Sequence, residues 1–242
     1  MAANKVRTGL SMLGILIGVA AVIAMLAIGK GAQKAIEGRL ASLGSNLLML
    51  RPGARAMHGV SHERGASSRF TLDDVKAVAK ADPRILRVEG NASGSAQVVY
   101  GSKNANTQVT GATPLYAQMR NSEPYFGRFF TEAENERQER VALLGQTVAN
   151  NLFEEEDPVG KEIKVNRVNF KVIGVLPLKG AMGFRDQDDM ILMPLNTAMK
   201  RALGKKHLDS IAIECDGADS MAEVMRGVQA LMRRRHRLPP YK

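Results

Sequence analysis

The residues best suited to chemistry in this sequence are Asp186, Asp188 and Asp189, which lie together in a glycine- and aspartate-rich stretch, residues 180–189. Carboxylate oxygens at such close spacing are ligands that a calcium ion prefers. Acidic residues at a loop tip are more often solvated or cap nearby backbone groups. We therefore retain Asp186, Asp188 and Asp189 as candidates for contact with a partner, and we predict no metal site.

The other residue types that could support catalysis are scattered. His58 and His62 are four residues apart, but their surroundings show no helical periodicity that would place both rings on one face. The sequence contains no Walker phosphate loop, no His-Glu-x-x-His, no Cys-x-x-Cys and no Gly-x-Ser-x-Gly. Cys215 lies in an alternating apolar stretch, which favours a buried and inert thiol. The sequence predicts no catalytic residue and no cofactor bound by this chain.

An uncharged run at the start of the chain predicts a membrane anchor. The 22 residues between Arg7 and Lys30 carry no charge, and a helix of about this length crosses a bilayer core of ~30 Å. We assign residues 1–7 to the cytoplasmic N-terminus and residues 8–29 to a transmembrane helix. A cleaved signal peptide is the alternative, although its apolar part is usually shorter, about 7–15 residues.

Two glycines in this run indicate contact with other membrane helices. Gly14 and Gly18 are four residues apart, so they share a helix face on which a second helix can approach closely. They are our helix-packing candidates, and the span is expected to be one helix of a larger bundle. Residues 30–44 keep a helical pattern that ends at Gly44, so we expect a stalk helix to continue from the span.

The rest of the chain alternates between strand-like and helix-like patterns. Thr71 and Asp74 have the spacing of a capping box, which predicts a helix start. Apolar residues recur at helical spacing from Met221 to Met232. Residues 54–68 are expected to form a mobile loop. Strands are expected at residues 46–51, 85–89, 96–100, 106–110, 140–144, 162–166, 168–176, 190–193 and 208–215, and a short helix at residues 146–154.

These patterns predict an α+β protein with one N-terminal transmembrane helix. We expect a split α/β subdomain from residues 45–105 and 206–238, with a β-rich subdomain, residues 106–205, inserted into it.

The net charge is +10, and four arginines lie in the stretch from Met232 to Arg237. Nucleic acid is not expected as a partner, because the chain has no tryptophan and no aromatic residues among the basic ones. A basic helix end near a membrane surface, or one that complements its own helix dipole, is the better explanation.

An ordered set of short motifs along the whole chain resembles the MacB-type ABC-transporter permeases, and in particular their first transmembrane helix and periplasmic core domain. No single motif is decisive, but their order is specific. The motifs are NKVRT (4–8), LGILIGVA (13–20), LGSNL (43–47), PG (52–53), TLDD (71–74), VTG (109–111), GRFF (127–130), VALLG (141–145), PVGK (158–161), FKVIG (170–174), DQDD (186–189) and RRRH (233–236).

The resemblance implies a bacterial inner-membrane protein with its globular domain in the periplasm. It implies that the split α/β subdomain is porter-like and that the insertion is sabre-like. It also implies a homodimer or a permease heterodimer, ATP and magnesium on a separate ATP-binding subunit, and a periplasmic adaptor as a further partner. The expected role is non-catalytic: transmission of ATP-driven motion for efflux or extraction of a periplasmic substrate. A stand-alone membrane-anchored binding or scaffold protein is the alternative.

Two departures from the family pattern affect these expectations. Family members carry further transmembrane helices after the core domain, so the sequence that ends at Lys242 is expected to be a fragment, a split gene product or an engineered piece. Asn166 and Arg167 replace the usual Asn-Gly of a hairpin, so a type I′ turn would place Arg167 at positive φ.

We also expect the stalk, residues 30–43, and the last helix, residues 220–236, to lie side by side and to carry motion between membrane and domain. Cysteine pairs placed on facing positions of the two helices should then form cross-links. Failure at every facing pair would refute this arrangement.

Overall fold

The computed structural model describes residues 2–42, 46–53, 56–57, 60–61, 69–182 and 185–238. The chain divides into two compact units, Met1–Leu43 and Gly44–Lys242. Each unit is described by itself. The expected packing of residues 30–43 against residues 220–236 joins the two units and stays a prediction. His58 and His62 lie outside the described residues.

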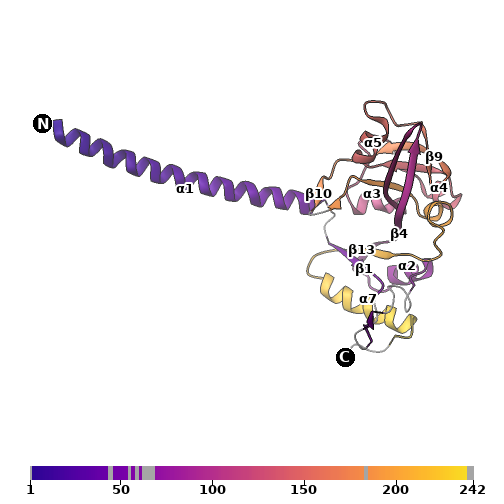
Figure 1. Ribbon diagram of the computed structural model, residues 1–242. Helices are drawn as coiled ribbons and strands as arrows, with labels where there is room; N and C mark the ends of the chain where they lie inside the picture. Colours follow the sequence, from indigo (N-terminus) through magenta and orange to yellow (C-terminus); the bar gives the residue numbers. More distant parts are fainter. Residues whose placement is uncertain are drawn as a thin grey trace. The chain divides into compact units, whose positions relative to one another are not determined.

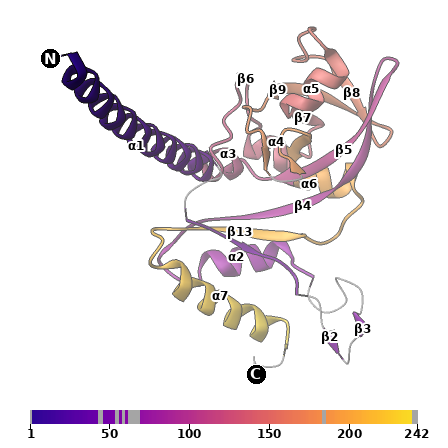
Figure 2. The same cartoon turned by 60° about the vertical axis from the view of Figure 1, so that its left-hand side comes forward.

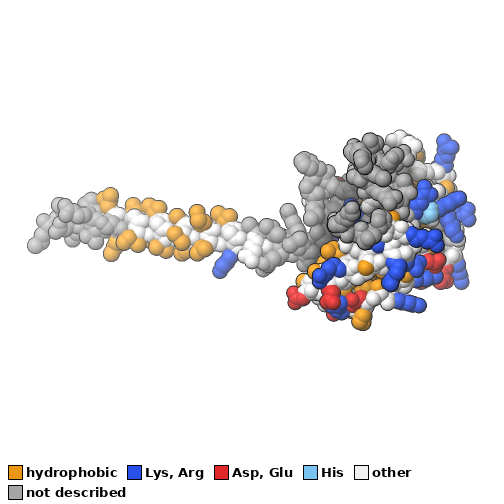
Figure 3. All heavy atoms as spheres, turned by 90° about the horizontal axis from the view of Figure 1, so that it is seen from below, with side chains coloured by type: hydrophobic (Ala, Val, Ile, Leu, Met, Phe, Trp, Pro, Cys, Tyr) orange, Lys and Arg blue, Asp and Glu red, His pale blue; other side chains and the backbone are white. Residues whose placement is uncertain are grey.

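The first unit is a single helix, α1 (Ala2–Ser42), without a break (Figure 1). Within the described residues, one segment is long and apolar enough to cross a membrane, Met12–Gly31, with a mean hydropathy of 2.6 and no buried part. Apolar side chains project from both edges of the helix in Figure 3. A methyl group added at Gly14 or Gly18 would meet no atom within 4 Å. Their role in helix packing therefore stays a prediction.

The second unit is a mixed α/β domain built on one nine-stranded sheet. The strand order is β1-β13-β4-β5-β12-β7-β9-β6, and β8 pairs with both β4 and β9. Two neighbouring pairs are parallel, β12 with β5 and β7 with β9, and the other pairs are antiparallel. The strands of this sheet are β1 (Leu47–Leu50), β4 (Ile85–Tyr100), β5 (Lys103–Ala112), β6 (Phe126–Gly127), β7 (Val141–Leu144), β8 (Glu162–Val165), β9 (Val168–Val175), β12 (Met190–Pro194) and β13 (Ser210–Cys215).

Two small hairpins lie outside this sheet, and helices cover it. The helices are α2 (Leu72–Ala79), α3 (Leu115–Met119), α4 (Glu132–Glu136), α5 (Gln146–Phe153), α6 (Leu195–Thr197), which continues as a π-helical turn (Ala198–Ala202), and α7 (Met221–Arg235). One hairpin pairs β2 (Ala56–Met57) with β3 (Val60–Ser61) in the stretch expected to be a loop. The other pairs β10 (Ala181–Met182) with β11 (Arg185–Asp186). Helices α2 and α7 lie on one face of β4 and β13, and α3 lies on the other (Figure 2).

The prediction of two separate strands at residues 85–89 and 96–100 is wrong, because both belong to the 16-residue strand β4. The glycines and serines between them suggest a turn, but the backbone there is paired with β13 up to Asn91 and with β5 from Ala92 onward. Gly90 serves packing, since a Cβ there would lie 2.7 Å from Leu208 Cδ1. Tertiary pairing thus overrides the local turn composition.

The interior contains three hydrophobic clusters rather than two separated cores. One lies between α2, α7 and the β1-β13-β4 part of the sheet, and two lie around β5, β7, β9 and β12. Strand β4 contributes Val88 to the first cluster and Val98 to the second. The boundary expected between residues 105 and 106 falls inside β5. The proposed division into subdomains therefore runs through a continuous hairpin.

Several local predictions are confirmed. Thr71 and Asp74 form a capping box at the start of α2. The β8–β9 turn holds Asn166 at φ 44° and Arg167 at φ 74°, as a type I′ turn requires. Cys215 is 1% exposed, and burial raises the pKa of its thiol. Such a thiol is structural and not reactive.

Asp74 connects α2 to the end of α7. Its carboxylate accepts hydrogen bonds from Thr71 N (2.9 Å) and Arg235 Nε (2.8 Å), and lies 3.1 Å from His236 Nε2. Burial raises the pKa of Asp74, but the hydrogen bonds from Arg235 and Thr71 outweigh burial, and the pKa lies below its usual value. The stabilisation is therefore present above the unfolded-state pKa and is lost as pH falls through the folded-state pKa.

Replacing Asp74 with alanine should destabilise the domain by about 3 kcal/mol, because Arg235 would lose its buried partner and the Thr71 N–H would lose its acceptor in the capping box of α2. Denaturant unfolding of the full chain in mild detergent measures the change. Asp73→Ala is the matched control: this exposed neighbour contacts only Lys76, at 3.9 Å, so about 0.5 kcal/mol is expected. Equal losses in the two variants would contradict the role assigned to Asp74.

Candidate functional site

The three acidic candidates do not converge on a common point. Asp188 is 4% exposed and accepts hydrogen bonds from Lys179 N (2.9 Å) and Gly180 N (2.7 Å). Its carboxylate thus fixes the backbone that follows β9. Asp188 was expected at an exposed loop tip and is buried instead. Its contact with a partner stays a prediction.

The two neighbouring acids bond to different elements. Asp189 Oδ1 accepts from Thr107 Oγ1 on β5 at 2.6 Å, and Asp186 Oδ2 accepts from Thr147 Oγ1 on α5 at 2.7 Å. Asp186 is exposed and stays a candidate for partner contact. In the part of the chain that the structure describes, no three His, Cys, Asp or Glu side chains gather to hold a metal ion.

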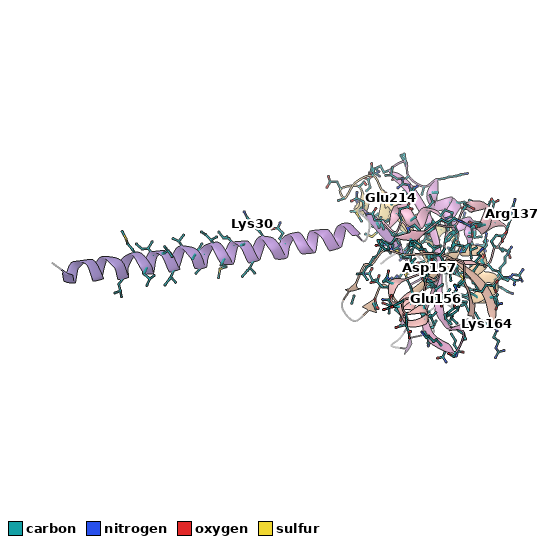
Figure 4. All side chains as sticks on the ribbon, turned by 90° about the horizontal axis from the view of Figure 1, so that it is seen from above. Lys30, Arg137, Glu156, Asp157, Lys164 and Glu214 are labelled. Carbon is teal, nitrogen blue, oxygen red and sulfur yellow. The ribbon has the colours of Figure 1, made fainter. Side chains whose placement is uncertain are left out.

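An open cavity of about 690 Å³ lies where the β4–β5 turn meets the end of α5. The rings of Tyr100 and Phe153 stack there with centroids 4.1 Å apart. Glu156, labelled beside Asp157 in Figure 4, accepts from Tyr100 and from Lys161 at 2.6 Å. Glu156 is thus paired with neighbouring groups. The cavity is open to solvent, and we derive no ligand from its lining.

The most unusual polar group is Glu89, in the middle of β4. It is 0% exposed, and its Oε1 accepts a hydrogen bond from Thr113 N at 3.0 Å. Burial raises the pKa of Glu89 to about 8, opposed by the charge of Arg120 and by the Thr113 N–H. Among the described residues, no cation lies within ion-pair distance of this carboxyl.

Arg120 stands beside Glu89 at the end of α3 without pairing with it. Its guanidinium carbon lies 5.2 Å from the centroid of the Tyr116 ring, and its Nη2 lies 3.2 Å from Met49 Sδ on β1. Its Nε is buried without a partner. The guanidinium thus stabilises the ionised form of Glu89 through its charge and not through a hydrogen bond. Its contacts with the Tyr116 ring and the Met49 sulfur connect α3 to the edge strand of the sheet.

Lys179, which follows β9, bonds to the residues at the end of α3. Its Nζ donates to Arg120 O and to Ser122 Oγ, both at 2.6 Å. Burial, and after it the charge of Arg120, lower the pKa of Lys179 to about 8. Residues 113–122, which include α3, are therefore held to β4 through Thr113 and to the β9 end through Lys179. We call this stretch the α3 segment.

The sequence did not single out Glu89 or Lys179. Arg87, Glu89 and Asn91 alternate along β4 as the solvent face of an antiparallel strand would, and Arg87 does pair with Glu214 at 2.8 Å. Burial of Glu89 depends on the α3 segment, which begins 24 residues later in the chain. The one local signal of a buried polar site is Asn91, a polar residue that lies between a glycine and an alanine in the strand.

The chain thus combines one candidate membrane helix with a mixed α/β domain. The chain belongs to the MacB-like periplasmic core domain family, whose model matches residues 8–231. It is 54% identical over 239 residues to the macrolide export ATP-binding/permease protein MacB of Bdellovibrio bacteriovorus and 48% identical over 238 residues to that of Chlorobaculum tepidum.

The alignments cover 99% and 98% of this chain but only 37% of each relative, so the chain spans less than half the length of these proteins. Among solved structures, the periplasmic region of MacB from Actinobacillus actinomycetemcomitans matches with a TM-score of 0.67 at 23% identity, covering 82% of this chain and 88% of that one. The extracellular domain of the transporter YknZ matches with a TM-score of 0.66 at 18% identity, covering 79% and 96%. These two likenesses show the shared fold.

Proposed function

We propose that this chain is the first span and periplasmic domain of a bacterial inner-membrane ABC permease, and that the domain transmits ATP-driven motion for efflux of a periplasmic substrate. The observation that carries the proposal is a candidate span in the same chain as a family match that covers residues 8–231. The name of the two relatives makes macrolides the first substrate class to test. Extraction of a periplasmic substrate is the alternative use of the same motion.

The shape of α1 supports a mechanical role. The helix continues beyond the candidate span, which ends at Gly31 directly after Lys30 (labelled in Figure 4), and runs to Ser42 without a proline. A continuous helix resists axial compression because every turn is closed by backbone hydrogen bonds. In the domain, Asp74 locks α2 to α7, so these two helices would move as one body.

The expected partners follow from the same proposal. They are the remaining transmembrane helices of the permease, a second permease in a homodimer or heterodimer, an ATP-binding component and a periplasmic adaptor. The names of the two relatives combine ATP binding and permease in one protein. The resemblance implied that ATP and magnesium bind to a separate ATP-binding subunit. The combined names leave open a second arrangement, in which they bind to another part of the same protein.

A domain exchange tests the proposal. Residues 1–242 would replace the corresponding region of the Bdellovibrio relative, and macrolide resistance and ATP hydrolysis would be measured in the same cells. Resistance close to that of the parent protein is expected. A matched exchange that carries Asp74→Ala should lower resistance while ATP hydrolysis continues. A well-folded exchange that hydrolyses ATP but confers no resistance would favour the stand-alone binding or scaffold role.

A further inference from the structure

The Glu89 carboxyl is the centre of a cluster of unpaired buried polar atoms. Five residues in the described part of the chain carry a buried side-chain nitrogen or oxygen without a hydrogen-bond partner. Glu89 is one of them, and three others adjoin its carboxyl, because the charge of Arg120 and the side chains of Asn91 and Thr113 all act on Glu89. Buried polar atoms without partners are rare in folded proteins. Because several of them gather at one carboxyl, we infer that a hydrogen bond is missing there.

The protonation state of Glu89 decides whether that bond exists. Oε1 is satisfied by the Thr113 N–H, whereas Oε2 is buried and has no donor. An ionised carboxylate only accepts hydrogen bonds, so in the observed arrangement Oε2 would carry buried charge without a donor within hydrogen-bond distance, even though the neighbouring side chains of Asn91 and Thr113 favour the charged form. A protonated carboxyl gains an O–H donor at Oε2. The unpaired Oδ1 of Asn91 and Oγ1 of Thr113 are then available acceptors beside it.

We propose that Glu89 is a proton-binding site, and that its bound proton holds the α3 segment, residues 113–122, on β4. In the protonated form Oε1 accepts from Thr113 N and Oε2–H donates to a neighbouring side-chain oxygen. When the proton leaves to solvent, Oε2 becomes a charged acceptor without a donor. The α3 segment must then shift so that Arg120 or water can reach Oε2.

The other charged and titratable groups around Glu89 are few. From α3 and the turn after it come Tyr116 and Arg120. Along the same sheet face, Arg87 and Glu214 neutralise each other at 2.8 Å. The positions on β13 opposite Glu89 and Asn91 are Ala212 and Ser210, both uncharged. Lys179 acts from the far side of Arg120. None of these replaces the missing donor at Oε2. The folded-state pKa of about 8 for Glu89 places the change in the mildly alkaline range.

Two measurements on the full chain in lipid nanodiscs test the proposal. With ¹³C-labelled glutamate, one carboxyl resonance should titrate near pH 8 and be absent from Glu89→Gln. Hydrogen exchange of peptides from the α3 segment, corrected for the intrinsic pH dependence, should lose protection by about tenfold for each pH unit between about pH 5 and the folded-state pKa of about 8, and this loss should level off above that pKa. In Glu89→Gln, which cannot ionise, protection should not change over the same pH range.

Glu214→Gln is the matched control, since it changes a carboxylate on the same sheet face and should keep the wild-type pH profile. A wild-type chain in which no glutamate titrates above pH 7, or a Glu89→Gln variant that still loses protection over the same pH range, would overturn the proposal. The carboxyl titration in the wild-type chain stands even if Glu89→Gln fails to fold. The inference concerns the domain alone, so its outcome is independent of the transport assay.

Discussion

Alanine at Gly127 is expected to unfold the domain at a markedly lower denaturant concentration, with a loss of about 3 kcal/mol or more. Gly127 has φ 85°, a conformation that costs a residue with a Cβ about 1–2 kcal/mol. A Cβ there would also lie 2.3 Å from Ile173 O and 2.7 Å from Gly174 Cα. The β6–β9 pairing, which sets Gly127 opposite Gly174, would have to separate.

Gly160→Ala separates the two contributions to that loss. Gly160 has nearly the same backbone conformation, φ 87°, but a Cβ there would meet nothing within 4 Å. Its substitution should therefore cost only the conformational strain, about 1–2 kcal/mol. Calorimetry or denaturant unfolding of the full chain in detergent measures both. Equal destabilisation by the two substitutions would show that the contact between β6 and β9 contributes nothing.

Neutralising Glu89 is expected to remove a large pH dependence of stability. The pKa of Glu89 is about 8 in the folded chain, against an ordinary value of 4.5 for glutamate. Between these two pH values the folded chain binds a proton that the unfolded chain releases, so the contribution to stability falls as pH rises. The contribution is complete below pH ~4.5 and is lost by the folded-state pKa. A shift of this size corresponds to several kcal/mol.

In Glu89→Gln this slope should disappear, and the variant should be more stable than the wild-type chain near pH 8, because no charge needs to be buried. Lys179 adds the opposite trend at higher pH. Its folded-state pKa of about 8 lies below the ordinary lysine value of 10.5, so stability should rise with pH between these values. Unfolding curves at a series of pH values measure both limbs. Parallel pH profiles for wild type and Glu89→Gln would contradict the assignment.

Sequence patterns were sufficient where the cause of structure is local. The capping box at Thr71 and Asp74, the type I′ turn at Asn166 and Arg167, and the amphipathic helix α7 all formed as predicted. Each depends on side chains a few residues apart, whose spacing is visible in the chain. The candidate span and the family were likewise evident, because a long uncharged run and an ordered set of motifs need no tertiary contact to be recognised.

Local patterns failed where distant segments decide the outcome. Glycine and serine at residues 90–95 indicated a turn, yet pairing with β13 and β5 makes them the middle of β4. Asp188 was assigned to an exposed loop, but the backbone amides of Lys179 and Gly180 enclose its carboxylate. For β4 the partner strands lie far along the chain, whereas the amides that bond to Asp188 lie only eight and nine residues before it. In both cases composition alone does not reveal the hydrogen bonds.

The sequence by itself determined the candidate span, the mixed α/β class, the family and the absence of the catalytic motifs sought. The tertiary structure decided how the domain is joined: one strand, β4, runs through both parts, and the expected boundary at residues 105 and 106 falls within its hairpin. It also decided that Glu89 is buried, because the α3 segment covers a strand face that the alternation of Arg87, Glu89 and Asn91 would leave in water. Burial depends on which segments meet, and a pattern within one strand carries no information about the segment that covers it.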